Sequence, residues 1–127
     1  MARKPRTTRP TPGDLDPLIH ERLRLGMLSA LVVQESMSFT ELRNLLQTTD
    51  GNLSVQARKL EAAGYVICDK KFEARKPKST YRLSGTGRAA LEAYLETLSG
   101  LLPGLDQVRN GRSAALRAQI NPLPSHS

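Results

Sequence analysis

Apolar residues recur at spacings of three and four positions in four stretches of the chain, and this pattern predicts four helices. The first should begin at Asp16 and Pro17, because Asp is a favoured N-cap and Pro fits the first helical position. It is expected to continue to about Gln34. Its apolar residues surround most of its circumference, so we expect it to be covered both by the protein's own core and by a second subunit.

The next two predicted helices are short and lie close together in the sequence. Ser38 and Glu41 have the spacing of a capping box, with Thr40 as the alternative cap. Thr48 or Thr49 should cap the helix that follows. Two short helices joined by so few residues, the second polar at its start, predict a helix-turn-helix.

Two segments of strand type follow, residues 65–72 and 79–84, and they should pair as a hairpin around a loop from Glu73 to Lys78. Ser84 is expected to cap a last helix, which Pro103 ends. The predicted fold class is therefore mainly α with a small antiparallel β-hairpin, in the order α-α-α-β-β-α of a winged helix-turn-helix.

Composition divides the chain into three parts. Residues 1–15 are rich in Pro, Thr and Arg without apolar periodicity, and we interpret them as a disordered basic arm. Residues 16–102 form the predicted winged-helix domain, with the last helix in a dimerisation role. Residues 103–127 are expected to be a flexible or weakly helical tail.

The charge is positive and unevenly placed. The formal net charge is +7 with a pI near 10.1, which favours an anionic partner such as nucleic acid. Residues 70–82 contain six basic residues against one acid, a net charge of +5. The aromatic content of 4% argues against a base-stacking platform for single strands.

Other function classes receive no support. The single cysteine, Cys68, excludes an internal disulfide framework; we interpret it as a strand residue, the alternative being a redox-sensing thiolate. No cysteine or histidine pair has ligand spacing, so neither a metal nor another cofactor is expected. No catalytic constellation is present, and the Gly-x-Gly at 85–87 is interpreted as a helix start with a closely packed Gly87.

No apolar run approaches the length of a membrane span and no signal peptide is recognisable, so we expect a cytoplasmic protein without membrane contact.

The segments "FTELRNLLQTTDGNLSVQARKLEAAGYV" and "TYRLSGTGRAALEAYL" resemble the small winged-helix transcriptional regulators related to the MarR and ArsR groups. The resemblance covers about residues 15–99. It implies that the third helix is a recognition helix that enters the major groove of double-stranded DNA, that the hairpin is a wing on the flanking backbone or minor groove, and that the protein pairs through its terminal helices.

The candidate contact residues follow from this resemblance and from the charges. The recognition-helix candidates are Thr49, Gly51, Asn52, Ser54, Gln56, Arg58 and Lys59. The wing candidates are Lys70, Lys71, Arg75, Lys76, Lys78 and Thr80. A minor-groove arm would use Arg3, Lys4, Arg6 and Arg9, although this segment can equally be an inert tail. The candidate dimer interface is Leu18, Ile19, Leu25, Tyr94, Leu98 and Leu101.

The sequence therefore predicts a sequence-specific, homodimeric DNA-binding regulator that is not an enzyme. The alternative is an architectural or protein-interaction winged helix that binds nucleic acid without sequence preference. An effector, if there is one, would have to bind between subunits or beneath the first and last helices, because no separate sensor domain is recognisable.

Overall fold

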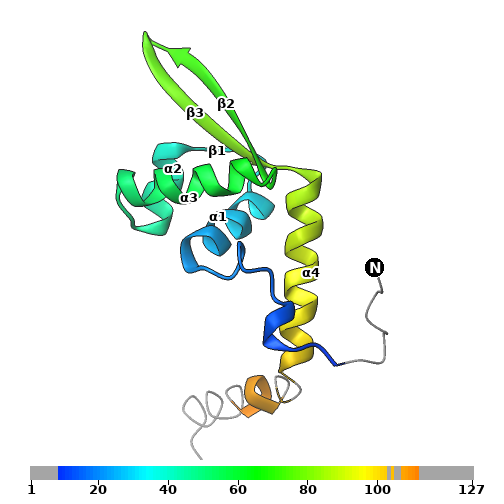
Figure 1. Ribbon diagram of the computed structural model, residues 1–127. Helices are drawn as coiled ribbons and strands as arrows, with labels where there is room; N and C mark the ends of the chain where they lie inside the picture. Colours follow the sequence, from blue (N-terminus) through cyan, green and yellow to red (C-terminus); the bar gives the residue numbers. More distant parts are fainter. Residues whose placement is uncertain (1–8, 103, 105–106, 112–127) are drawn as a thin grey trace, which may run out of the picture.

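The computed structural model describes residues 9–102, 104 and 107–111, and its elements follow the order expected for a winged helix (Figure 1). The elements are η1 (Pro12–Asp14), α1 (Arg22–Val33), β1 (Met37–Ser38), α2 (Phe39–Leu46), α3 (Asp50–Ala62), β2 (Val66–Glu73), β3 (Lys76–Leu83) and α4 (Gly85–Leu101). The predicted fold class is thus confirmed, with a third short strand added to the hairpin.

The first helix begins later than predicted. Glu21 is its N-cap and accepts a hydrogen bond from the backbone N–H of Arg24 at 2.8 Å. The prediction of a cap at Asp16 is wrong, because the Asp16 carboxylate is used elsewhere: one oxygen accepts from the Leu18 N–H at 2.9 Å and the other from the Tyr65 hydroxyl at 2.5 Å. Residues 17–21 therefore form turns that lead into α1 and not its first turn.

The caps of the other helices form through local hydrogen bonds, as predicted. Ser38 and Glu41 make the reciprocal capping box, with distances of 2.8 and 3.1 Å. Thr49 caps α3 by accepting from the Asn52 N–H at 3.2 Å, and Ser84 caps α4 by accepting from the Gly87 N–H at 2.9 Å.

The three strands form an antiparallel sheet in the order β1-β3-β2. Met37 of β1 pairs with Tyr81 of β3, and this pairing attaches the start of the helix-turn-helix to the hairpin. The sequence pattern did not indicate β1. The hairpin itself is longer than predicted. Its strands include most of the expected loop and are joined by Ala74 and Arg75 alone, at φ values of 52° and 67°.

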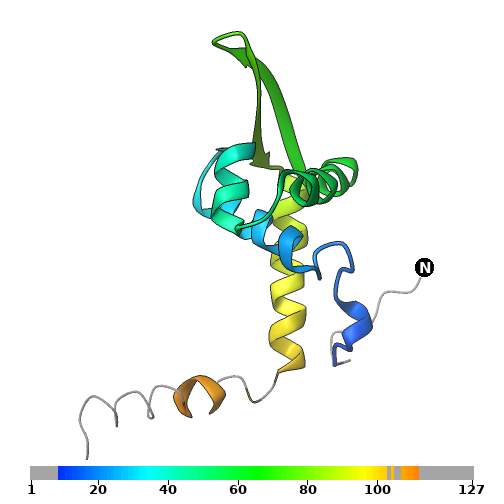
Figure 2. The same ribbon diagram turned by 90° about the vertical axis from the view of Figure 1, so that its left-hand side faces the viewer.

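One core lies between the helices and the base of the sheet. Its buried residues are Ile19, Met27, Leu28, Leu31, Met37, Leu42, Leu53, Ala57, Leu60, Val66, Tyr81, Leu91 and Tyr94. α1 contributes three of them and touches α2, α3, β3 and α4, so it is the central element. The outer half of the hairpin extends beyond this core, and both views show it projecting away from the helices (Figures 1 and 2).

Gly87 fixes how α4 meets the start of the hairpin. A Cβ atom at this position would lie 2.1 Å from the carbonyl oxygen of Tyr65, so only glycine permits this approach. The same carbonyl accepts the backbone N–H of Ser84 at 3.1 Å. The interpretation of the Gly-x-Gly segment as a closely packed helix start therefore agrees with the structure.

Short elements lie at both ends of the described chain. Residues 9–15 contain η1, and Pro10 lies against Gly100 of α4, so folded structure begins before the expected boundary at residue 16. Residues 107–111 form a helical turn within the predicted tail. Residues 1–8 and 112–127, on which the remaining predictions for arm and tail fall, lie outside the described residues.

Candidate nucleic-acid interface

The outer face of α3 presents a mixed polar and apolar surface to solvent. Leu53, Ala57 and Leu60 bury the opposite face, which leaves Gly51, Asn52, Val55, Arg58 and Lys59 exposed. Ser54 is half-buried at the edge of this surface. Val55, with 48% of its surface exposed, is a residue that the prediction omitted, because base contacts were sought among side chains that form hydrogen bonds. Its methyl groups are suited to contact with the thymine methyl in a major groove.

Gln56 does not belong to that outer face. Its amide oxygen accepts a hydrogen bond from the Arg24 guanidinium of α1. Arg24 is only 9% exposed and also donates from Nε to the carbonyl oxygen of Leu18. Gln56 thus connects α3 to the core side of the protein, and we correct its prediction as a base-contacting residue. Neither partner was recognisable from sequence, since 32 residues separate them.

The start of α3 is held by two polar side chains, one of which was predicted both as a helix cap and as a DNA contact. Thr49 uses its hydroxyl oxygen for the helix cap. Asp50 accepts from the Arg43 guanidinium of α2 at 2.7 Å, across the turn of the helix-turn-helix. Both contacts orient the first turn of α3, and they leave the side chain of Asn52 exposed.

The basic residues of the hairpin divide into paired and unpaired groups. Lys78 lies 3.3 Å from Glu73, and Arg82 lies 3.5 Å from Asp69. Within the described part of the chain, the other four form no ion pair; these are Lys70, Lys71, Arg75 and Lys76. Thr80, the remaining wing candidate, is half-buried opposite Asp69 in the sheet. The hairpin therefore carries four unpaired cations on its solvent-exposed half.

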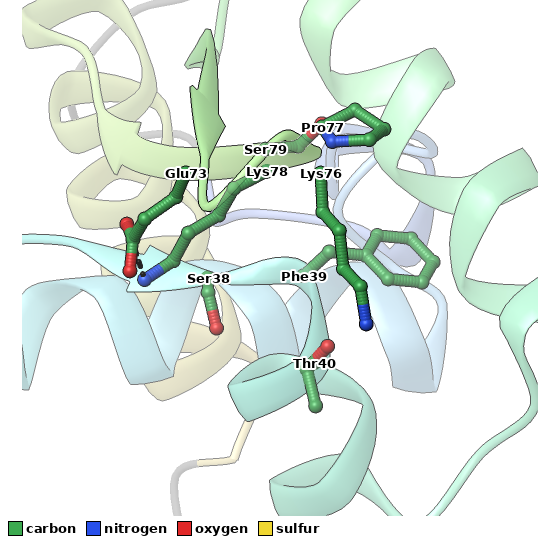
Figure 3. A pocket seen from close by; sticks show the side chains of 8 residues that line it. All are labelled: Ser38, Phe39, Thr40, Glu73, Lys76, Pro77, Lys78 and Ser79. Carbon is green, nitrogen blue, oxygen red and sulfur yellow. Dashed lines mark ion pairs between the residues drawn. The ribbon is translucent and has the colours of Figure 1, made fainter.

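A cavity of about 550 Å³ separates the hairpin from the first turn of α2 (Figure 3). Figure 3 shows Lys76 extending from the hairpin toward Phe39 and Thr40, while Lys78 turns to Glu73. The hydrogen bond from the Ser38 backbone N–H lowers the pKa of the Glu41 carboxyl, because this bond stabilises the ionised form.

A second, smaller cavity of about 190 Å³ lies where the hairpin meets α3. Ser54 and Arg58 line it from α3, and Lys70 and Ser79 from the hairpin. The outer face of α3 and one face of the hairpin are therefore neighbours. A ligand as large as a duplex that contacts one of these two surfaces is within reach of the other.

Two of the predicted interface residues lie in the core of the single chain. Ile19 is fully buried, and Tyr94 is 4% exposed, with its hydroxyl 2.8 Å from Nδ1 of His20. We correct both predictions, since neither side chain is available to a partner. The half-buried residues Leu18, Leu25, Leu98 and Leu101 remain, and α4 adds Leu95, which is 50% exposed.

The remaining candidates add little to this picture. Arg9 is exposed beside η1, whereas Arg3, Lys4 and Arg6 lie outside the described residues. Cys68 is half-buried on β2 opposite Tyr81, and the raised pKa of Tyr81 follows first from its burial. In the described ranges, no three metal-ligating side chains gather, and no helix is long and apolar enough to cross a membrane.

Comparison with known proteins assigns this architecture to a family. Residues 23–102 match the family of winged helix DNA-binding domains, and the chain belongs to that family. It is 32% identical over 73 residues to the uncharacterized protein MJ0432 of Methanocaldococcus jannaschii, covering 58% of this chain and 79% of that protein.

Two solved structures with the same fold are named as a transcriptional regulator homologue and a transcriptional repressor. A transcriptional regulator homologue from Pyrococcus horikoshii is 27% identical, with a TM-score of 0.64 over 70% of this chain and 88% of that one. The transcriptional repressor CouR, solved with a 23-mer DNA duplex, is 18% identical, with a TM-score of 0.61 over 82% of this chain and 76% of that one. The predicted winged-helix regulator family is confirmed, and the domain that residues 23–102 match is a DNA-binding domain.

Proposed function

We propose that this protein is a sequence-specific regulator of transcription that binds double-stranded DNA as a homodimer. α3 enters the major groove, and the hairpin contacts the flanking backbone or minor groove. Its kinship to the MarR and ArsR groups belongs to the same proposal. The family assignment supports DNA as the ligand, and the named neighbours support transcription as the process.

The observation that carries this proposal is the adjacency of two chemically different surfaces. Ser54 and Arg58 of α3 line the same cavity as Lys70 of the hairpin. The α3 face offers hydrogen-bonding and methyl groups, which can distinguish base edges, whereas the hairpin offers unpaired cations, which bind phosphates of any sequence. A duplex that lies along α3 would bring its neighbouring backbone to the hairpin.

The exposed apolar face of α4 supports the homodimer. Leu95 and Leu102 are 50% and 44% exposed, and Leu98 and Leu101 are half-buried between them. A second copy of this helix would cover such a surface, and two-fold symmetry would then place two copies of α3 about 34 Å apart. An effector would bind between the subunits or beneath α1 and α4.

Selection of bound duplexes from a random pool tests whether the protein prefers a particular DNA sequence. We expect an enriched inverted repeat that binds at least ~10³-fold more tightly than scrambled DNA. The absence of an enriched sequence, together with salt-dependent binding to every duplex, would replace this proposal by the architectural role.

Light scattering of Leu95→Glu tests the dimer, with Glu92→Gln on exposed α4 surface as the control. We expect a monomer for Leu95→Glu and a dimer for the control. A Leu95→Glu protein that remains dimeric would remove this face of α4 from the interface. Removing residues 105–127 tests in the same way whether the tail contributes.

A further inference from the structure

We propose that Phe72, supported by Pro77, is an apolar contact that enters the minor groove of the duplex beside the segment that α3 reads. This inference rests on the proposed DNA-binding function and deepens it, because it gives the hairpin a second kind of contact besides its charges. It also gives a reason for a large aromatic side chain with 80% of its surface exposed.

Phe72 is unusually exposed for its type. With 80% of its surface accessible, it lies next to last on β2, opposite Pro77 of β3. Both side chains stand on the same face of the sheet, because directly paired residues do so. The aromatic ring and the pyrrolidine ring therefore form one apolar patch near the tip, where no core residue covers it.

The patch stands on the face of the hairpin that includes Lys70, and its Pro77 also lines the cavity between the hairpin and the first turn of α2. Side chains along a strand alternate between faces, so Phe72 shares its face with Lys70 and Cys68. Lys70 lines the cavity with Ser54 and Arg58 of α3, and Tyr81, the partner of Cys68, lines it as well. Phe72 lies one repeat farther along the same face, about 7 Å beyond Lys70. Any duplex in contact with α3 and with Lys70 would meet Phe72 next.

The surrounding charges decide between DNA and other occupants of this patch. The neighbours of Phe72 in the hairpin include Lys70, Lys71, Arg75 and Lys76, all of which lack an ion-pair partner among the described residues. A second copy of the hairpin would bring the same cations against them and would be repelled. A duplex brings phosphates on both sides of a groove whose floor and sugar walls are partly apolar. Phe and Pro are among the side chains with which minor-groove proteins contact and wedge base steps.

The salt dependence of duplex affinity distinguishes an apolar contact of Phe72 from the contacts of the hairpin cations. Phe72→Thr removes the ring and keeps a residue that favours strands, whereas Phe72→Leu retains an apolar side chain. Val33→Thr, at an 85% exposed position at the end of α1, is the matched control. Affinity for the selected duplex would be titrated at several salt concentrations, with Lys71→Gln as the charge reference, after each melting temperature has been checked.

We expect Phe72→Thr to weaken binding roughly 10- to 100-fold at every salt concentration, without changing the slope of log K against log salt. Phe72→Leu should recover most of the affinity, and Val33→Thr should match the parent. Lys71→Gln should instead make the slope shallower by about 0.9. Hydroxyl-radical cleavage of deoxyribose, which proceeds through the minor groove, should show a protected flanking segment that Phe72→Thr loses.

Three results would overturn the inference. One is parental affinity and parental protection in Phe72→Thr. Another is a Phe72→Thr slope that changes as that of Lys71→Gln does. The third is a protein whose self-association without DNA depends on Phe72 while its duplex binding does not, which would assign the patch to a second copy of the chain. Failure of the parent protein to bind any duplex is a different result, since it would refute the proposed function and not only the role of Phe72.

Discussion

Several polar side chains of α3 are bound within the protein, whereas most cations of the hairpin are not. Around α3, side chains are engaged within the protein: Thr49 caps the helix, Asp50 pairs with Arg43, and Gln56 is bound by Arg24. On the hairpin, four cations have no ion-pair partner in the described part of the chain. The first arrangement fixes a surface before a ligand arrives. The second leaves charge available to a ligand, which is suited to binding phosphates along a backbone.

Under the proposed function, this contrast predicts that the hairpin contributes affinity and that α3 discriminates between sequences. Charges that neutralise phosphates release counterions from any duplex, so they strengthen binding without distinguishing sequences. Side chains that meet base edges distinguish sequences, and each contributes a modest free energy. The variants below test whether these two properties can be changed separately.

The largest expected effect comes from removing the hairpin charges together. Replacing Lys70, Lys71, Arg75 and Lys76 with Gln should weaken selected and scrambled duplexes alike, by about 100-fold or more at low salt. The slope of log K against log salt should become shallower by up to about 3.6, at about 0.9 for each lost contact. Fluorescence anisotropy measures both quantities. Arginine at the three lysine positions is the charge-preserving control, and unequal losses for the two duplexes would contradict the division of roles.

Truncation on α3 should give a smaller and selective loss. Asn52→Ala or Ser54→Ala should each weaken the selected duplex by about 1–3 kcal/mol and leave scrambled DNA and the salt slope unchanged. Ser29→Ala, the same change at an exposed position of α1, is the control for the serine. Equal weakening of both duplexes would move α3 from reading bases to holding phosphates.

The sequence predicted those parts of this comparison that depend on neighbouring residues. The caps at Ser38, Thr49 and Ser84 were recognisable because each hydroxyl bonds an N–H three residues ahead. The outer face of α3, with Val55 on it, followed from the helical spacing of Leu53, Ala57 and Leu60, although Val55 was not considered as a contact residue.

The parts that the sequence did not predict depend on distant partners. Asp16 has the features of a helix cap, but its carboxylate bonds to Tyr65, 49 residues away. Gln56 has the features of a base reader until Arg24 is seen to bind it. The six hairpin bases became four unpaired ones only when the register placed Lys78 beside Glu73 and Arg82 beside Asp69.

The hydrogen bond from the Tyr65 hydroxyl to the Asp16 carboxylate should stabilise the base of the hairpin. Tyr65 directly precedes β2, and Tyr65→Phe should lower the free energy of unfolding by about 1 kcal/mol, measured by urea titration. The hydrogen bond to Asp16 raises the pKa of Tyr65 from 10.0 to about 12. The folded state therefore retains the phenol proton more tightly than the unfolded state does.

The sign of the pH dependence follows from that shift. The contribution of Tyr65 is fully present below about pH 10 and is lost as the pH rises toward about 12. The difference in free energy of unfolding between the parent and Tyr65→Phe should shrink over this interval, because the Tyr65 hydroxyl loses the proton that it donates to Asp16. Other titrating groups affect both proteins equally, so the difference isolates this contribution. A difference that is constant from pH 9 to 12 would show that the bond does not contribute in solution.

The smallest expected effect concerns the turn of the hairpin. Ala74 and Arg75 both have positive φ, the geometry of a two-residue hairpin turn that usually selects Asn-Gly. An L-residue in this region costs about 1–2 kcal/mol, and glycine relieves the cost while adding flexibility to the unfolded chain. Ala74→Gly should therefore slow amide exchange in β2 and β3 by an amount equivalent to about 1 kcal/mol or less. Ala89→Gly, at an exposed position within α4, should destabilise the protein by a similar amount, since its backbone has no strain to relieve.

If Ala74→Gly instead speeds exchange and leaves DNA affinity unchanged, then the turn is not under strain. If affinity falls although all four cations remain, then the rigidity of the turn contributes to binding, and the hairpin is prearranged as α3 is.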